Sequence, residues 1–278
     1  MISVLIPVRN EKANIVACIE SARWADEIVV VDSGSTDGTV ELAEKNGATV
    51  VQFKWNGKFQ KKKNWALENV SWKNEWILIL DADERITPEL AAEILSELKN
   101  PRADGYFINR RFIFLGQWLR HCGYYPSWNL RLFRHKLGRY EEVQTIDSAS
   151  GDNEIHEHVV LDGTAAHLKN DMMHFAYPDI FTWMEKHNRY SNWEAEIEVR
   201  GETSGASGTG IGAQLSARRR LRVFSRRLPF RPALRFFYSY ILKLGFLDGV
   251  EGLAIANMAA LYNFVKYAKA RFMSPGRE

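Results

Sequence analysis

The stretch Trp76-Ile77-Leu78-Ile79-Leu80-Asp81-Ala82-Asp83 places two carboxylates directly after five consecutive apolar residues. A short run that is apolar at every position is typical of a strand buried on both faces, as in a parallel sheet covered by helices. Ligands of such sheets bind at the carboxyl ends of the strands. The stretch therefore predicts a buried strand that delivers Asp81 and Asp83 to a ligand-binding edge.

Strand and helix patterns alternate around this stretch. The predicted strands are Ile2–Ile6, Glu27–Asp32 and Ala48–Phe53, and the predicted helices are Asn14–Ala25, Thr39–Asn46 and Lys61–Val70. Gly47 is the expected left-handed residue after one helix, and Thr87 followed by Pro88 is a typical start of another. We therefore predict an α/β fold, with a Rossmann-like, mostly parallel twisted sheet flanked by helices. Residues 105–133 have weak periodicity and are expected to mix strands and loops.

The composition indicates a folded chain with a sizeable core. The chain has 278 residues, of which 46% are hydrophobic, and its formal net charge is +3. This excludes a disordered protein, and two cysteines, Cys18 and Cys122, are too few for a disulfide framework and indicate a reducing compartment. We expect neither a signal peptide nor a membrane-spanning helix, because no apolar run is long enough.

Composition also divides the chain into three expected regions. They are a main α/β domain at 1–200, a flexible Gly/Ser-rich linker or loop at 201–216, and a basic amphipathic helical extension at 217–278. Residues 217–237 contain eight arginines and no acidic residue, which suits an anionic membrane surface. The alternatives are a helical hairpin packed on the main domain, an interface of a homo-oligomer, or an arginine-rich tail that binds nucleic acid.

Asp81 and Asp83 form the strongest local candidate for a metal site. In an extended chain, residues two apart point to the same side. Two carboxylates on one side offer hard oxygen ligands to Mg²⁺ or Mn²⁺, and substrate phosphates usually complete the coordination. The alternative is a polar strand end followed by an ordinary loop.

Polar residues also follow two other predicted strands. Asp32 precedes Ser33-Gly34-Ser35-Thr36-Asp37-Gly38-Thr39, whose small side chains let the backbone approach a ligand, and Pro7-Val8-Arg9-Asn10-Glu11 follows the first strand. Lys61-Lys62-Lys63 lies near a helix start and suits a diphosphate, although a lysine run is often only a solvated face. The loop after Asp32 lacks Gly-x-Gly-x-x-Gly and the Gly-Lys-Ser/Thr ending, which disfavours dinucleotide-binding and kinase functions.

Aromatic and arginine side chains alternate farther along the chain. Trp118, Tyr125 and Trp128 could stack on sugar rings, and Arg131 could pair with a carboxylate or phosphate. These residues are a candidate acceptor platform, with ordinary packing over the sheet as the alternative.

Taken together, these motifs resemble the family 2 glycosyltransferases of GT-A fold. The matching motifs are Ile6-Pro7-x-x-Asn10-Glu11, Val30-Val31-Asp32-Ser33-Gly34-Ser35-x-Asp37-Gly38-Thr39, Lys63-Asn64-Trp65-Ala66-Leu67 and Leu80-Asp81-Ala82-Asp83-Glu84. Within this family, the sequence is most similar to the bacterial branch that includes the lipopolysaccharide inner-core β-glucosyltransferases. The additional matching stretches are Leu115-Gly116-x-Trp118, Gly123-x-Tyr125-Pro126, Arg131-Leu132-Phe133, His156-Glu157 and Gly245-Phe246-Leu247-Asp248-Gly249. The resemblance spans nearly the whole chain outside 201–232.

The resemblance implies a UDP-sugar donor, Mn²⁺ or Mg²⁺, and inversion at the anomeric carbon. On this basis the expected nucleotide-sugar site comprises Pro7, Arg9, Asn10, Glu11, Asp32, Ser33, Gly34, Lys63, Asp81 and Ala82. Lys63 would lie near the diphosphate, and Asp81 near the ribose or a metal-bound water. Asp83 is the expected metal ligand, joined by His174 as in some GT-A enzymes.

An inverting transfer also needs a general base. Many relatives supply it from a paired acidic motif, from which this sequence departs. The best match is Ile155-His156-Glu157-His158, so Glu157 is the candidate catalytic base, with Asp152 or Glu154 as alternatives.

The resemblance further implies that glucose is transferred to a saccharide or lipid-linked glycan, such as lipopolysaccharide core. The expected location is cytoplasmic and peripheral, on the inner face of the cell membrane, and no nucleic-acid partner is expected. A non-catalytic nucleotide-sugar-binding protein is the main alternative, and a nucleic-acid-binding protein is the other.

Overall fold

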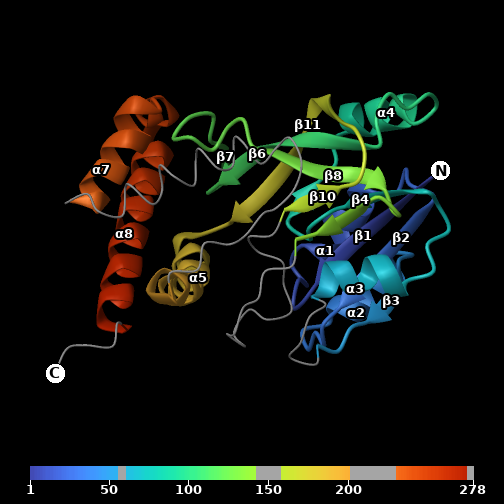
Figure 1. Cartoon of the computed structure of the whole chain (residues 1–278), viewed down its shortest axis with the longest axis horizontal. Helices are drawn as coiled ribbons and strands as arrows, with labels where there is room; N and C mark the ends of the chain where they lie inside the picture. Colours follow the sequence, from blue (N-terminus) through green and yellow to red (C-terminus); the bar gives the residue numbers. More distant parts are fainter. Residues whose placement is uncertain (56–60, 142–157, 201–229, 274–278) are drawn as a thin grey trace. The chain divides into compact units, whose positions relative to one another are not determined.

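The computed structural model describes residues 1–55, 61–141, 158–200 and 230–273 (Figure 1). The chain forms two compact units. The first consists of Met1–Arg111 and Pro126–Ala176, and the second of Phe112–Tyr125 and Tyr177–Glu278. The expected boundaries of the three regions, after residue 200 and after residue 216, stay predictions because residues 201–229 lie outside the described ranges.

The sheet of the first unit begins with four parallel strands. These are β1 (Ile2–Val8), β2 (Glu27–Asp32), β3 (Thr49–Gln52) and β4 (Trp76–Ile79), in the order β3-β2-β1-β4. The helices between them are α1 (Ile15–Ser21), α2 (Thr39–Lys45) and α3 (Lys62–Asn69). The predicted strands and helices of this region are confirmed, with ends that differ by up to four residues. Because β2 and β4 lie on opposite sides of β1, the chain reverses direction across the sheet at β1, where sheets of this kind bind ligands.

The remaining strands continue the sheet with antiparallel pairing. β8 (Trp128–Arg134) pairs with β4 and with β6 (Gly105–Phe114), and β11 (Ala165–Tyr177) follows β6 and pairs with β5 (Glu84–Arg85). β7 (Gln117–Trp118) pairs with the end of β6, while β9 (Gly138–Tyr140) and β10 (Val159–Leu161) form a separate sheet. The parallel half was predicted from apolar runs, and the antiparallel half consists of strands from residues 105–134 together with β5 and β11.

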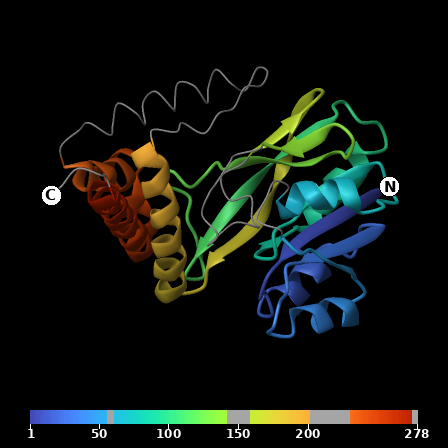
Figure 2. The same ribbon diagram turned by 60° about the horizontal axis from the view of Figure 1, so that its bottom comes forward.

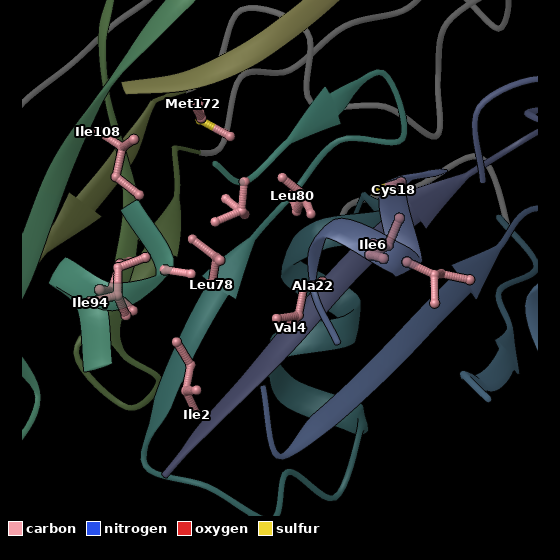
Figure 3. Close-up of a cluster of buried hydrophobic side chains, with 14 of the residues drawn as sticks. Ile2, Val4, Ile6, Cys18, Ala22, Leu78, Leu80, Ile94, Ile108 and Met172 are labelled. Atoms are coloured by element: carbon pink, nitrogen blue, oxygen red, sulfur yellow. The ribbon is translucent and has the colours of Figure 1, made fainter. Parts of the chain in front are cut away.

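Alternate residues of the central strands enter two separate cores. Ile2, Val4 and Ile6 of β1 pack with α1 and with α4 (Pro88–Glu97) on one face of the sheet (Figure 3). Leu5 packs on the other face, with Ile77, Ile79 and the α3 residues Ala66 and Leu67. β4 is therefore apolar at every position, because both faces of the sheet are covered.

Two helix boundaries follow the predicted capping chemistry. The Thr87 hydroxyl accepts a hydrogen bond from the Leu90 N–H at 3.2 Å, and Pro88 occupies the first turn of α4. Gly47 follows α2 with a φ of +89°, in the left-handed region.

The described part of the second unit is mainly helical. α5 (Ile180–Arg200) and α7 (Arg231–Phe237) both pack against α8 (Gly249–Met273), as Figures 1 and 2 show. A π-helical turn at Tyr238–Leu242 and a 3-10 turn at Gly245–Asp248 join α7 to α8. The C-terminal helical extension expected from the sequence is present in the described residues between Arg231 and Met273.

Within the described ranges, no single helix is long and apolar enough to cross a membrane. Arg231–Leu242 and Gly245–Met273 reach the length and apolar composition of a membrane span only when they are taken together. The two segments are bent by 73° relative to each other.

Candidate functional site

The ends of β1, β2 and β4 bring three sequence motifs to one edge of the sheet. β1 ends at Val8 beside Asp32 at the end of β2, and Leu5 pairs with Ile79 at the end of β4. The loops that follow these strands contain the predicted residues of the nucleotide-sugar site. This edge lies where the strand order reverses, as expected for a ligand crevice.

The chain turns at Asp81-Ala82-Asp83. The Glu84 N–H donates to the Asp81 carbonyl oxygen at 2.8 Å, and the Asp81 N–H donates to Glu84 Oε2 at 3.0 Å. The extended conformation predicted for this segment is therefore wrong, because these reciprocal hydrogen bonds close a turn. As a result, the two carboxylates contact different partners.

Two cations hold the Asp81 carboxylate. Lys63 Nζ lies 2.9 Å from Asp81 Oδ1, and Arg131 Nη2 lies 2.5 Å from Oδ2. Removal from water would raise the pKa of Asp81, but Arg131 and Lys63 hold this pKa well below its usual range. Asp81 is thus an anion at neutral pH and acts as an acceptor for hydrogen bonds.

Arg131 also contacts a second, fully buried carboxylate. Its Nη2 lies 2.7 Å from Glu84 Oε1, and Arg110 Nη1 approaches the same oxygen at 3.3 Å. The pKa of the buried Arg131 is raised well above its usual value by Asp81 and Glu84, which outweigh the effect of burial. Three cations thus face two carboxylates, and this excess positive charge suits the binding of an anion.

The lysine run at the start of α3 is buried, so the solvated face considered as an alternative is wrong. Lys62 is 1% exposed, and its Nζ donates to the Val8 carbonyl oxygen at 2.8 Å. Lys63 is 8% exposed. Asn64 fixes the helix start by exchanging hydrogen bonds with the backbone of Tyr140, at 2.7 and 3.0 Å. The ammonium groups therefore have set positions at the end of β1 and beside Asp81.

The loop after β2 wraps around the Asp32 carboxylate. Asp32 is buried, and it accepts hydrogen bonds from the Gly34 and Ser35 N–H groups, each at 3.0 Å, and from Ser35 Oγ at 2.5 Å. Gly34 needs its positive φ of +74° in this turn. Ser33 Oγ is buried without a hydrogen-bond partner in the described part of the chain, as expected for a group that a ligand would satisfy.

The loop after β1 is tied to the loop after β2. Asn10 has a left-handed φ of +56°, its N–H donates to Ser35 Oγ, and its Oδ1 accepts from the Thr36 N–H, both at 2.8 Å. The Glu11 N–H donates to Thr39 Oγ1 at 2.9 Å. Asn tolerates this backbone conformation better than most residues, which explains its place in the motif. Pro7 and Glu11 are half-buried, Arg9 is exposed, and Ala82 is buried.

Asp83 and His174 come together through strand pairing. His174 of β11 pairs with Glu84 of β5, and the Phe175 N–H donates to the Asp83 carbonyl oxygen at 2.8 Å. His174 Nε2 then lies 3.6 Å from Asp83 Oδ2. Among the described residues there is no group of three or more His, Cys, Asp or Glu side chains arranged to hold a metal. One oxygen and one nitrogen fit an ion such as Mn²⁺ that takes its other ligands from substrate and water.

The predicted acceptor residues fall into different surroundings. Trp118 and Tyr125 pack edge to face in the second unit, with ring centroids 5.3 Å apart, whereas Trp128 belongs to the first unit and is 41% exposed. Arg131 joins the Asp81 cluster described above. Glu157 and its alternatives Asp152 and Glu154 lie outside the described residues.

Sequence reasoning missed the parts played by Glu84 and Arg110. Glu84 appears in the Leu80–Glu84 motif, but it also accepts the turn-closing hydrogen bond from Asp81, and its two arginine partners come from β6 and β8. A glutamate next to Asp-Ala-Asp on a strand that must be buried is a signal that a cation lies nearby.

The parallel strands with their covering helices, and the charged side chains gathered where the strand order reverses, define an α/β fold of the kind that binds a ligand at this edge of the sheet. The family model for "Glycosyl transferase family 2" matches residues 3–153. The chain belongs to this family, and it is a glycosyltransferase with a GT-A type α/β fold and a C-terminal helical extension. This membership favours the enzyme over the non-catalytic binder and the nucleic-acid binder considered above.

The chain is similar along most of its length to curated glycosyltransferases. It is 31% identical to the lipopolysaccharide core biosynthesis glycosyltransferase LpsC of Rhizobium meliloti (strain 1021), over 96% of this chain and 91% of that protein. It is 28% identical to an uncharacterized glycosyltransferase of Rickettsia conorii, over 97% and 89% of the two chains. Among solved structures, S. aureus TarS 1-349 matches with 16% identity and a TM-score of 0.46, over 97% and 88%.

Proposed function

We propose that this protein is a metal-dependent, inverting hexosyltransferase that moves glucose from UDP-glucose to a lipid-linked glycan such as lipopolysaccharide core. The observation that supports it is the meeting of Asp32, the Lys63–Asp81–Arg131 cluster and the Asp83–His174 pair around one sheet edge. The name of the Rhizobium meliloti relative supports the class of acceptor.

The loops after β1 and β2 would hold the nucleoside. Asp32 offers a buried carboxylate. Ser33 Oγ is buried and has no hydrogen-bond partner within the described part of the chain, so it could bond to a ligand. Pro7, Asn10 and Glu11 line the neighbouring loop. Asp81 is anionic and would accept a hydrogen bond from the ribose or from a metal-bound water.

Asp83 and His174 would hold Mn²⁺ or Mg²⁺ close to the diphosphate. When bound, the ion neutralises negative charge that grows on the leaving diphosphate. Lys63 and Arg131 add fixed positive charge to the same region, which favours departure of an anion.

In the transfer step, an acceptor hydroxyl oxygen forms a bond to C1 of the sugar while the bond from C1 to the phosphate oxygen breaks. The electron pair of that bond leaves with UDP, and the hydroxyl proton passes to a carboxylate. We assign the proton acceptor to Glu157. Because the attack is opposite to the leaving group, the configuration at C1 is inverted.

The proposed place of action is the cytoplasmic face of the cell membrane, where the proposed lipid-linked acceptor would be held. The arginine-rich stretch within 217–237 supports attachment to an anionic surface.

A screen of nucleotide sugars tests the proposed reaction. The full chain is incubated with several UDP- and GDP-sugars, with MnCl₂ or with EDTA, and released nucleoside diphosphate is measured. UDP release from UDP-glucose that requires the metal supports the proposal, and NMR of a saccharide product should show the β-configuration. Retention of the α-configuration, or equal release in EDTA, would contradict it. Donor binding without release would favour the non-catalytic binder.

A further inference from the structure

The turn that joins α7 to α8 displays apolar side chains instead of burying them. In residues 241–250, the apolar bend, six large apolar side chains are exposed, from 41% for Ile241 to 76% for Val250. The others are Leu242, Leu244, Phe246 and Leu247. Single exposed apolar residues are ordinary, but six of them within ten residues indicate an interaction surface.

The backbone of the apolar bend is firmly anchored beneath these side chains. The Cys122 N–H donates to the Lys243 carbonyl oxygen at 3.0 Å, and the buried Asp248 carboxylate accepts from the His121 N–H at 2.8 Å. Gly245 is packed so closely that a Cβ there would lie 2.4 Å from Cys122 Sγ. The bend is therefore a fixed projection, because its backbone is pinned while its side chains point outward.

Two cations, Arg235 and Lys243, lie beside the apolar bend, and the half-buried Glu251 follows it in the first turn of α8. The sequence contains no acidic residue between Glu202 and Asp248, and Asp248 is buried. Arg235 and Lys243 lie over the ring of the half-exposed Tyr238, at 5.9 and 5.6 Å from its centroid. An apolar projection flanked by cations and a phenol matches a lipid leaflet, with apolar chains beneath anionic phosphates.

We propose that the apolar bend inserts into one leaflet of an anionic membrane, with Tyr238, Arg235 and Lys243 at the level of the lipid phosphates. This inference deepens the proposed membrane location and is independent of the transfer reaction. It differs from attraction by arginines alone, because insertion of apolar side chains gives binding that persists at high salt.

Vesicle flotation with a matched control tests the insertion. The test variant is L242S/F246S/L247S, and the control is L95S/F181S/M184S, whose residues are exposed to a similar extent on α4 and α5. The vesicles contain phosphatidylcholine and phosphatidylglycerol in equal parts. At high salt we expect the test variant to bind at least about tenfold more weakly than the wild type, while the control binds like the wild type.

A probe at the tip gives a direct readout. Both native cysteines are buried, and burial raises the pKa of the Cys122 thiol to about 11 and that of Cys18 still further, so neither reacts readily. Leu247→Cys is therefore the site that an environment-sensitive thiol probe would label. Its emission should shift to the blue on these vesicles, and the same probe on Phe181→Cys should not shift.

Vesicle binding of the test variant as tight as that of the wild type would overturn the inference. If its oligomeric state also changes, the bend is a contact between copies. If its thermal unfolding temperature falls instead, the bend is a surface covered by its own chain. UDP release without vesicles should stay unchanged in every variant, so failure of the insertion leaves the proposed reaction untouched.

Discussion

At the scale of single residues, Arg131 is the center of the charge cluster at the sheet edge. It lies between Asp81 and Glu84, and its side chain is 6% exposed. Two carboxylates so close together would repel each other without a cation between them. The position of Asp81, and hence the shape of the candidate donor site, depends on this arginine.

Replacing Arg131 by Met should therefore destabilise the fold. The variant removes the cation that Asp81 and the buried Glu84 share and leaves them only Lys63 and Arg110, so the free energy of unfolding should fall by about 3 kcal/mol in urea titrations. Arg134→Met is the control, because Arg134 lies on the same strand and pairs with Glu75, whose side chain is 65% exposed. It should lose no more than about 1 kcal/mol. An equal loss of unfolding free energy in the two variants would show that the buried cluster contributes no more to stability than the exposed ion pair.

Asp83→Asn tests the proposed metal site. The substitution keeps the size of the side chain but removes the charge that would attract the ion. We expect metal-stimulated UDP release to fall by about 10²-fold or more. Asp162→Asn changes an exposed aspartate and should leave the rate unchanged. A rate for Asp83→Asn close to that of the wild type would remove Asp83 from the metal site.

Glu157→Gln tests the proposed base. Loss of the proton acceptor should lower kcat by at least about 10²-fold, whereas binding of UDP, measured by calorimetry, should be retained. If turnover survives, the same substitution at Asp152 or Glu154 would identify the base instead.

At the scale of elements, a histidine joins α5 to α8. The His187 ring stacks on Trp183 with centroids 3.7 Å apart, meets the Tyr262 ring edge to face at 5.0 Å, and donates from Nδ1 to the Trp183 carbonyl oxygen. Removal from water lowers the pKa of His187 to about 4. The folded chain thus holds the neutral ring, while the unfolded chain takes up a proton near pH 6.5.

This difference predicts a loss of stability in acid. Above about pH 6.5 the ring is neutral in both states and has no effect. As the pH falls from there toward 4, the unfolded state binds the proton first, so the free energy of unfolding decreases. The partial exposure of the ring reduces the loss to about 1–2 kcal/mol. Urea titrations should show this slope in the wild type and a weaker one in His187→Phe, and identical slopes would contradict the prediction.

At the scale of the whole molecule, α5 depends on the far end of the chain. Trp183 and Ala195 of α5 are buried, and Lys266 of α8 lies 2.7 Å from Glu194. Truncation after Glu202 removes α8 and should expose the apolar side chains of α5. We expect stronger binding of the dye ANS and a lower unfolding temperature than in the full chain. Unchanged ANS binding would show that α5 is stable without α8.

This dependence bears on tests of membrane binding. A truncated chain that no longer binds vesicles would have lost both the apolar bend and its own packing. Point substitutions in the bend separate the two effects, since they leave α5 and α8 in contact.

The sequence alone determined the parallel half of the sheet, its helices, the helix caps at Thr87 and Gly47, and the motifs that gather at the sheet edge. These features depend on neighbouring residues, because apolar runs, capping groups and strand ends are local patterns. Only the tertiary structure decided the antiparallel half, the turn at Asp81–Asp83 and the burial of Lys62 and Lys63. It also decided that Arg131 pairs with Asp81 and Glu84, and that His174 lies beside Asp83. The turn is closed by the neighbouring Glu84, but each of the other features needs a partner from a distant element, and such a pairing is set by the packing of the whole sheet.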